Sequence, residues 1–340
     1  MRIGILTSGG DCPGINATIR GVCKTAINHY GMEVYGIHSG FQGLIDNDME
    51  PLTEKSMSGL LNMGGTILGT SREKPFKKRV GSAAGSEDKP AMIAKNVRDM
   101  QLDCIVCIGG NGTQKSASKM AAMGINVVSV PKTIDNDVWG TDLSFGFDTA
   151  VSIATDAIDR LHSTASAHKR VMVIEVMGHK AGWIALYSGM AGGGDVILLP
   201  ELPYNIHNIG NTIMSRLQKG KPYSIVVVGE GIVTDPEGKK RAGEYIAQEI
   251  EYETGFETRE TVLGYIQRGG TPTSFDRNLA TRMGGHATEL IANGQFGRMV
   301  SLQGDSITSV PLEEVGGKLK LVPEDHDLIV EGRKMGVCFG

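Results

Sequence analysis

Residues 125–137 read Ile-Asn-Val-Val-Ser-Val-Pro-Lys-Thr-Ile-Asp-Asn-Asp, an apolar run followed by two carboxylates two positions apart. The apolar part predicts a buried strand that ends at Pro131. Acids that follow a parallel strand lie at the edge of an α/β sheet where ligands bind. There, Asp135 and Asp137 would reach both a hydroxyl group and a metal-bound phosphate, one acting as base while the other orients. Taken alone, the loop could also be a turn whose Asp and Asn side chains cap backbone amides.

Apolar runs of strand length alternate with helical patterns along most of the chain. The runs are 3–6, 34–37, 104–108, 127–130, 171–176, 196–199, 225–228 and 262–266. This alternation predicts βαβ units and parallel sheets that helices cover on both faces. Residues 17–30 form a helical stretch, which Gly31 would end as a C-terminal cap.

Composition bounds the class of protein. The chain has 340 residues, 40% of them hydrophobic, which is enough for two domains with their own cores. A net charge of -4 with interspersed signs argues against a nucleic-acid partner. The apolar run at the N-terminus is too short for a signal peptide or a membrane span, so we expect a cytoplasmic protein.

Five cysteines without framework spacing fit a reducing compartment. The pair Cys104 and Cys107 lies inside a predicted strand, which favours a place in the core over a zinc site.

Glycines gather after predicted strands. Residues 7–14, Thr-Ser-Gly-Gly-Asp-Cys-Pro-Gly, join the first strand to the first helix, and residues 108–113, Ile-Gly-Gly-Asn-Gly-Thr, repeat the arrangement. Free amides and the helix dipole favour an anion at such a junction. Neither loop is a Walker A or a Gly-x-Gly-x-x-Gly motif, and a strand-to-helix turn often needs glycine for geometry alone. Two such loops together indicate a polyphosphate ligand.

Four arginines stand near glycine-rich or strand-end segments: Arg72, Arg170, Arg259 and Arg268. Any one of them alone could be a solvated surface residue. Together with the acids and the glycine loops they fit phosphoryl transfer, which needs cations around the moving group, a metal ion and a base for the acceptor hydroxyl.

Five segments, in order, resemble the signature blocks of the 6-phosphofructokinase family. They are Ser-Gly-Gly-Asp at 8–11, Gly-Gly-Asn-Gly-Thr at 109–113, Thr-Ile-Asp-Asn-Asp at 133–137, Glu-Val-Met-Gly at 175–178 and Gly-Tyr-Ile-Gln-Arg-Gly-Gly at 264–270. The resemblance implies phosphorylation of the 1-hydroxyl of fructose 6-phosphate in glycolysis, with ATP as donor and Mg²⁺ as cofactor. It also implies a homo-oligomer, a tetramer or else a dimer, whose active sites are shared between subunits.

The resemblance further implies the fold and its division. We expect two Rossmann-like α/β/α sandwich lobes with the active site in the cleft between them. The nucleotide-binding lobe would comprise residues 1–146 plus 267–303, and the sugar-phosphate-binding lobe residues 147–266 plus 304–340.

Matching positions receive roles from the family. Asp135 would take the proton from the sugar hydroxyl, with Asp137 supporting the magnesium-bound phosphates and Thr133 in the same catalytic segment. The nucleotide site would comprise Gly10, Arg72, Phe76, Gly110, Asn111, Gly112, Thr113 and Lys132, with Asn111 as the magnesium ligand. The sugar phosphate would contact Thr133, Asp135, Arg170, Met177, Gly178, His179, Glu230, Arg259, Tyr265 and Arg268. Of these, Arg170 and Arg259 match arginines that the family contributes from a neighbouring subunit.

The chain departs from the common bacterial pattern at several positions. Asn111 replaces a magnesium-associated aspartate, His179 an arginine, and Tyr265 a histidine. Lys132 is typical of members that use pyrophosphate, whereas Gly112 is the small residue associated with ATP. We give Gly112 more weight, because an aspartate there would crowd and repel the α-phosphate of the nucleotide.

Three other functions remain open at this stage. Within the same class they are a pyrophosphate-dependent phosphofructokinase and a kinase for a longer sugar phosphate such as sedoheptulose 7-phosphate. The third is a non-catalytic regulatory subunit, which Asn111 and His179 suggest and the retained Asp135 disfavours. Positions that match the family's allosteric nucleotide site are Arg20, Lys24, Lys55, His162, Lys219 and Lys221, for which ordinary surface charge is the alternative.

Overall fold

The computed structural model describes residues 1–77, 88–234 and 240–340, and the chain forms two compact units. The first unit comprises Met1–Thr133, Val138–Asp148 and Arg268–Leu319, and the second comprises Ile134–Asp137, Thr149–Gln267 and Lys320–Gly340. Residues 304–319 were expected in the second unit but belong to the first. The reason is that β11 (Ser306–Pro311) pairs antiparallel with β10 (Arg298–Gln303).

A seven-stranded sheet forms the centre of the first unit, in the order β11-β10-β5-β4-β1-β2-β3. Its remaining strands are β1 (Arg2–Ser8), β2 (Glu33–Ile37), β3 (Met49–Leu52), β4 (Cys104–Gly109) and β5 (Val127–Pro131). The five inner strands are parallel, as the alternating pattern predicted. The two edge strands, β3 and β11, are antiparallel to their neighbours, which the sequence did not indicate.

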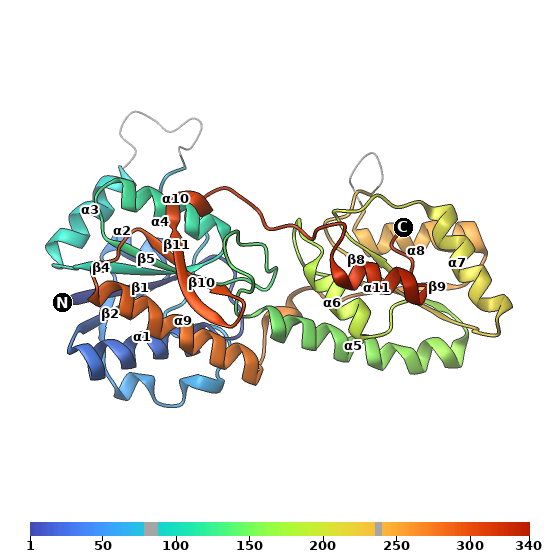
Figure 1. Ribbon diagram of the computed structural model, residues 1–340, viewed down its shortest axis with the longest axis horizontal. Coiled ribbons are helices and arrows are strands. Elements are labelled where there is room, and N and C mark those ends of the chain that lie inside the picture. Colours follow the sequence, from blue (N-terminus) through green and yellow to red (C-terminus); the bar gives the residue numbers. More distant parts are fainter. Residues whose placement is uncertain (78–87, 235–239) are drawn as a thin grey trace. The chain divides into compact units, whose positions relative to one another are not determined.

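Helices cover both faces of this sheet (Figure 1). They are α1 (Ile15–Tyr30), α2 (Phe41–Asp46), α3 (Lys89–Asp99), α4 (Asn111–Ala122), α9 (Ser274–Ala292) and α10 (Leu312–Val315), with short 3₁₀ helices η1 (Lys55–Met57) and η2 (Leu60–Asn62). α1 ends at Gly31, which adopts the left-handed conformation with φ 61°, as predicted. α1 and α9 lie side by side on one face, and Gly21 allows their close approach, since a Cβ there would lie 2.8 Å from the carbonyl oxygen of Thr281.

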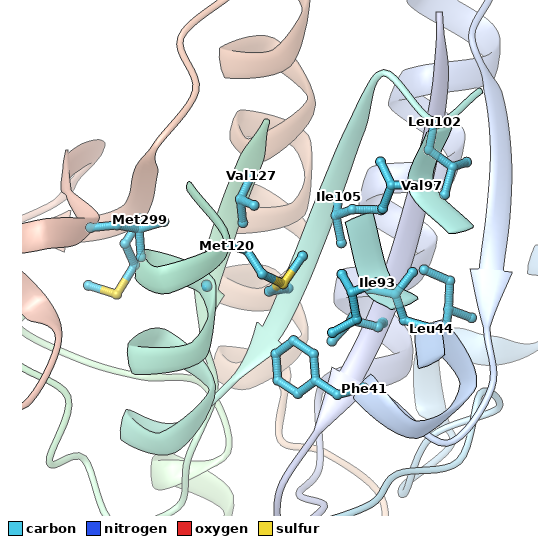
Figure 2. Packing of buried hydrophobic residues seen from close by; sticks show 14 of the residues in the cluster. Phe41, Leu44, Ile93, Val97, Leu102, Ile105, Met120, Val127 and Met299 are labelled. Atoms are coloured by element: carbon cyan, nitrogen blue, oxygen red, sulfur yellow. The ribbon is translucent and has the colours of Figure 1, made fainter. Parts of the chain in front are cut away.

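The core on the opposite face joins α2, α3 and α4 to the strands (Figure 2). Phe41, Ile93 and Met120 pack there against Ile105, and all four side chains are buried. Burying an apolar side chain of this size stabilises the folded state by about 1.5–3 kcal/mol. Cys107 belongs to the same cluster, and burial raises the pKa of its thiol, so this cysteine is a core residue as predicted.

The second unit holds a four-stranded parallel sheet in the order β7-β8-β6-β9. The strands are β6 (Val171–Val176), β7 (Val196–Leu198), β8 (Ser224–Gly229) and β9 (Thr258–Val262). The strand expected over residues 262–266 is wrong, because β9 ends at Val262 and the 3₁₀ helix η3 (Gly264–Arg268) follows. β9 lies at the sheet edge and is half-exposed, so its residues, Thr-Arg-Glu-Thr-Val, form no apolar run.

Five α-helices accompany this second sheet: α5 (Phe147–His168), α6 (Trp183–Ala191), α7 (Ile206–Gln218), α8 (Ala242–Thr254) and α11 (Asp327–Met335). Ile209 of α7 and Ile246 of α8 pack on the sheet face that carries Val171 and Val173. Within the described ranges, no helix is both long enough and apolar enough to cross a membrane.

Candidate active site

Two glycine loops leave the first sheet at the same edge. β1 and β4 are parallel neighbours, and their last residues, Ser8 and Gly109, stand opposite each other in the register. One loop leads into α1 and the other into α4, so the N-termini of both helices lie at this edge. The N-cap residues, Gly14 and Gly110, have no side chain with which to cap the first amides. Such helix ends attract anions such as phosphates.

The space beside Gly112 is open. A Cβ built on this exposed residue in the first turn of α4 meets no other atom of the described chain within 4 Å. The situation differs at Gly10, where a Cβ would lie 2.6 Å from Nη1 of Arg268, and at Gly109, where it would clash with Thr113. Glycine is therefore needed for packing at two of these positions, whereas at Gly112 it leaves room outside the protein.

The ammonium group of Lys132 lies on the loop after β1. The Lys132 side chain is only 2% exposed, and its Nζ donates to the carbonyl oxygen of Ser8 at 3.1 Å and to that of Gly10. A buried cation needs such oxygen partners to offset its lost hydration. The structure thus brings together Lys132 and Gly10, which were both predicted for the nucleotide site. The Lys132 side chain is hydrogen-bonded to the backbone of the first loop.

The segment before Arg72 is fastened to the same loop. Thr70 donates from Oγ1 to the carbonyl oxygen of Gly9 at 2.6 Å, and the amide of Gly9 donates to the carbonyl oxygen of Ser71 at 3.0 Å. Arg72 follows directly and is exposed. Phe76 instead packs against the first core. Arg72 is therefore free to reach a ligand at the loop, while Phe76 is partly buried beside the helices.

Arg268 also contacts the first loop. Its Nη1 donates to the carbonyl oxygen of Asp11 at 3.1 Å, and its Nε is buried without a hydrogen-bond partner among the described residues. We predicted Arg268 as a ligand of the sugar phosphate. The structure adds that this guanidinium lies against Gly10, so its charge also acts on the nucleotide loop.

The loop with the two acids begins at the end of β5. Pro131 pairs with Gly109, which puts the start of the acid loop beside the second glycine loop. Thr133 and Asp137 are buried, whereas Asp135 is partly exposed. Between the two acids, Asn136 adopts the left-handed backbone with φ 52°. Asn tolerates that conformation better than most residues, and it turns the chain so that successive side chains diverge.

Asn111, the predicted magnesium ligand, is the first residue of α4. Mg²⁺ in phosphoryl-transfer sites usually takes one or two oxygen ligands from the protein and the others from phosphates and water. Across the described residues there is no cluster of three or more His, Cys, Asp or Glu side chains that could hold a metal ion. The amide oxygen of Asn111 is buried at this helix end, and amide oxygens are among the ligands that such ions accept.

A second set of predicted residues gathers in the second unit, where β6 and β8 end. Glu230 follows β8, and its Oε1 accepts hydrogen bonds from the amides of Gly178 at 3.2 Å and His179 at 2.8 Å. Gly178 has φ 150° and His179 has φ 54°, so the turn after Met177 depends on conformations that few residues adopt. One carboxylate thus fixes the loop that carries three predicted sugar-phosphate ligands.

Arg170 and Arg259 share one carboxylate. Arg170 donates from Nε to Glu257 at 2.7 Å, and Arg259 donates from Nη2 to the other oxygen of the same side chain. The hydrogen bond from Arg170 is the main cause of a lowered pKa of Glu257. The shared carboxylate holds two like charges side by side and leaves further N–H groups of each guanidinium for an anion.

These two arginines lie at the opposite end of β6 from the Met177 loop. Arg170 directly precedes β6, Arg259 pairs with Met172 in the adjacent strand β9, and Met177 directly follows β6. At roughly 3.3 Å per residue, the ends of this segment are about 20 Å apart. Within one chain, the backbone at Arg170 and the Met177 loop are therefore separated by the full length of β6.

Sequence reasoning missed Glu257 and Lys320. Glu257 has no motif, although its position two residues before Arg259 was a signal that could have been read. Lys320 lies in a tail without a recognised pattern, and its amide donates to the carbonyl oxygen of Asp137 at 2.9 Å. Tyr265, which was predicted, is 73% exposed on η3.

Three of the basic residues predicted for an effector line one surface pocket of the first unit. Arg20, Lys24 and Lys55 surround a pocket of about 480 Å³ together with Glu54. Lys219 and Lys221 follow α7 in the second unit. His162 uses both ring nitrogens internally, on the carbonyl oxygen of Gly192 at 2.7 Å and the hydroxyl of Tyr223 at 3.2 Å.

Comparison with known proteins identifies the family. Residues 2–291 match the family model described as Phosphofructokinase. The chain belongs to the phosphofructokinase family. This confirms the resemblance on which the sequence-based assignment of site residues depends.

Relatives match this family member along its whole length. A Bacteroides thetaiotaomicron protein named ATP-dependent 6-phosphofructokinase 3 is 81% identical over 100% of both chains. A Spirochaeta thermophila protein named ATP-dependent 6-phosphofructokinase is 55% identical, covering 99% of this chain and 97% of its own. A Streptomyces coelicolor protein named pyrophosphate--fructose 6-phosphate 1-phosphotransferase is 45% identical over 100% of both chains.

Solved phosphofructokinase structures have the same fold. The crystal structure of Pichia pastoris phosphofructokinase in the T-state superposes with a TM-score of 0.84 at 31% identity. It covers 92% of this chain, which spans only 35% of the Pichia chain. The mixed α/β architecture with parallel sheets, predicted from the alternating pattern, is thereby confirmed.

Proposed function

We propose that this chain is an ATP-dependent 6-phosphofructokinase. It transfers the γ-phosphoryl group of ATP to the 1-hydroxyl of fructose 6-phosphate and yields fructose 1,6-bisphosphate and ADP, a step of glycolysis. The observation that carries the proposal is the acid loop after β5, whose start pairs with the second glycine loop. Phosphoryl transfer requires such a base beside a phosphate-binding loop. The relative that is 81% identical along the full length supports the same reaction.

Asp135 acts as the general base. Its side chain is partly exposed between buried neighbours, so it can receive the proton of the sugar hydroxyl as the oxygen attacks phosphorus. The bond from phosphorus to the bridging oxygen of ADP breaks in the same transfer. Asp137, which is buried, and Thr133 orient the phosphates and the acceptor.

The first unit binds the nucleotide. Its two glycine loops offer helix N-termini to the phosphates, and Arg72 and Arg268 add positive charge at the first loop. Asn111 would hold Mg²⁺ through its amide oxygen together with the nucleotide. When bound, the metal ion neutralises charge on the phosphates.

ATP is favoured over pyrophosphate as donor. The open space beside Gly112 fits an α-phosphate, which pyrophosphate lacks. Lys132, the residue typical of pyrophosphate users, binds backbone carbonyls of the first loop, and this role serves either donor. The 45% identical relative with a pyrophosphate name keeps that donor as the alternative. Sedoheptulose 7-phosphate remains the alternative acceptor.

The second unit binds the sugar phosphate, and the site is shared between subunits. Met177, Gly178, His179 and Glu230 form one part of the site at the carboxyl end of β6. Because Arg170 and Arg259 lie about 20 Å away at the other end of that strand, they serve the site of a neighbouring copy. We therefore propose a homotetramer, or a dimer, as the active form.

We further propose an anionic effector and a cytoplasmic location. The basic pocket around Arg20, Lys24 and Lys55 supports an anionic effector, whereas both ring nitrogens of His162 are used in hydrogen bonds within the second unit. All five cysteines are free, which fits a reducing cytoplasm.

The test is product formation by the purified chain. With fructose 6-phosphate, MgCl₂ and ATP, we expect fructose 1,6-bisphosphate and ADP in equal amounts, measured by a coupled assay. Sedoheptulose 7-phosphate in place of fructose 6-phosphate tests the alternative acceptor. Absence of bisphosphate with either ATP or pyrophosphate would favour a non-catalytic regulatory subunit.

A further inference from the structure

The loop between the two acids is contacted by a single lysine of the C-terminal tail. Nζ of Lys320 donates to Oδ1 of Asn136 at 2.9 Å, and its backbone amide donates to the carbonyl oxygen of Asp137 at 2.9 Å. One residue thus holds both the side chain of the middle loop residue and the backbone of the second acid. Nothing in the signature blocks of the family includes this position.

Lys320 is itself held in place from the other side. Its carbonyl oxygen accepts a hydrogen bond from Nε1 of Trp183 at 2.9 Å, and its Nζ lies 5.4 Å from the centre of the Trp183 ring. Trp183 is buried at the start of α6. The contact of an ammonium group with an indole face is attractive by about 0.5–2 kcal/mol. The ammonium position is therefore determined by the ring as well as by Asn136.

The tail is fixed again two residues later. The amide of Val322 donates to Oε1 of Glu201 at 2.9 Å, and the same carboxylate accepts from the amide of Gly182. Gly182 is the N-cap of α6. Tail, α6 and acid loop are thus joined within the second unit by hydrogen bonds on both sides of Lys320.

The backbone conformation of Asn136 explains why the acid loop needs these contacts. Its left-handed conformation separates Asp135 from Asp137, and a non-glycine residue holds it only when its surroundings compensate for the strain. A general base must be held to within about half an ångström of its working position. The bond from Lys320 fixes the side chain of the residue that joins the two acids in the sequence.

We propose that Lys320 is a positioning residue for the phosphoryl-transfer reaction. Through Asn136 and the carbonyl of Asp137 it holds the acid loop, and it acts through them without touching substrate. This inference rests on the proposed function, because it assigns Asp135 and Asp137 the roles given above.

Replacement of Lys320 by Met tests the proposal, since Met keeps most of the unbranched apolar stem of the side chain and removes its charge and donor. We expect kcat to fall by roughly tenfold, the cost of a displacement below 1 Å, with the KM of both substrates within about threefold of wild type. Lys320→Arg keeps the charge and a donor, and should recover kcat to within about threefold. Lys318→Met is the matched control. Lys318 lies two residues earlier, with its own ammonium 5.7 Å from the Trp139 ring, and its loss should leave kcat unchanged.

A double-mutant cycle with Asn136→Gly separates positioning from general damage. Glycine adopts the left-handed backbone without strain but lacks the acceptor for Lys320. We expect the Asn136→Gly and Lys320→Met variants to lose kcat to a similar extent, and the double variant to lose no more than either. Multiplied losses in the double variant would overturn the proposal.

Three further outcomes are decisive. The positioning role is overturned if the kcat of Lys320→Met lies within twofold of that of an active wild type. It is also overturned if Lys320→Met and Lys318→Met lose kcat equally. Either result leaves the proposed function intact. If thermal unfolding shows that Lys320→Met does not fold, Asn136→Gly decides, and a kcat within twofold of wild type overturns the proposal. Wild-type protein that is inactive with both donors overturns the proposed function, and this inference with it.

Discussion

Gly112 is the residue whose surroundings bear most directly on the choice of donor. Replacing it by Asp adds a carboxylate at the first turn of α4, on a Cβ that no other atom of the described chain approaches within 4 Å. Because that charge would face the α-phosphate of ATP in a partly dehydrated site, we expect kcat/KM for ATP to fall by at least tenfold. Use of pyrophosphate should fall less or increase, since pyrophosphate has no α-phosphate.

The control for this change is Gly112→Ala, which adds the Cβ without the charge. It should keep kcat/KM for ATP within a few-fold of wild type, because nothing in the described chain lies within 4 Å of the new atom. Equal losses in the Ala and Asp variants would mean that bulk alone is responsible and that charge repulsion plays no part.

Lys132 makes contacts that its residue type alone does not predict. From the sequence, an added lysine beside two acids indicates a phosphate ligand. In the structure, the buried ammonium group binds carbonyl oxygens of Ser8 and Gly10, and the sequence could not predict this because it depends on β1 and β5 lying two strands apart in one sheet. The glycine loops, in contrast, were predictable because they adjoin apolar strands.

Most of the buried strands were predicted, although the buried strand β10 was missed, and the half-exposed edge strands were missed or displaced. The runs at β4, β6 and β8 are apolar because helices cover both faces of those strands. The strand β9 was placed too late in the prediction, because the exposed residues Arg259 and Glu260 interrupt any apolar run in this edge strand. β11 was missed for the same reason, and with it the assignment of residues 304–319 to the first unit.

The site follows the same division. Positions inside signature blocks, such as Gly178, could be named from the sequence. Contacts that join blocks distant in the chain could not, because they depend on pairing between strands. Glu257 between Arg170 and Arg259 is one example, and Lys320 on Asn136 is the other.

At the junction of β6 and α8, the buried carboxyl group of Glu175 makes stability depend on pH. Burial raises its pKa, and the nearby Glu230 and Glu260 raise it further, against the lowering effects of a hydrogen bond from the Gly243 amide and of Arg241. The folded state therefore binds the proton more tightly than the unfolded chain. This contribution to stability is fully present below the unfolded pKa and is lost as pH rises through the folded pKa.

Glu175→Gln should consequently stabilise the fold at neutral pH. Glutamine keeps the size and an oxygen for the Gly243 amide but carries no charge to bury. We expect the midpoint of thermal unfolding to rise by roughly a few degrees at pH 7 and to match wild type near pH 4. A variant that is less stable than wild type at pH 7 would show that the carboxylate itself is needed there.

For the assembled molecule, a shared active site predicts complementation between two inactive variants. Asp135→Ser should lower turnover by roughly two to four orders of magnitude, the usual contribution of a positioned general base. Arg259→Ala should raise the KM for the sugar phosphate more than that for ATP. When subunits of the two variants are mixed by dissociation and reassociation, about a quarter of the sites should combine an intact Asp135 with an intact Arg259.

The decisive comparison is between the activity of the reassociated mixture and the mean activity of the two parent variants. Activity well above that mean supports sites built from two subunits. The control is Arg160→Ala mixed with Asp135→Ser, since Arg160 is an exposed residue of α5 whose side chain pairs with Asp156 one turn earlier. Activity equal to the mean of the parents would contradict a shared site.

The most direct measurement is the steady-state kcat/KM of the wild-type protein for ATP and for pyrophosphate, with saturating fructose 6-phosphate and magnesium. The value for each donor depends on the acid loop, on the two glycine loops and on the open space at Gly112. Our account predicts a clear preference for ATP, with fructose 1,6-bisphosphate as the product. A preference for pyrophosphate would contradict it and would make Lys132 the residue that reports the donor.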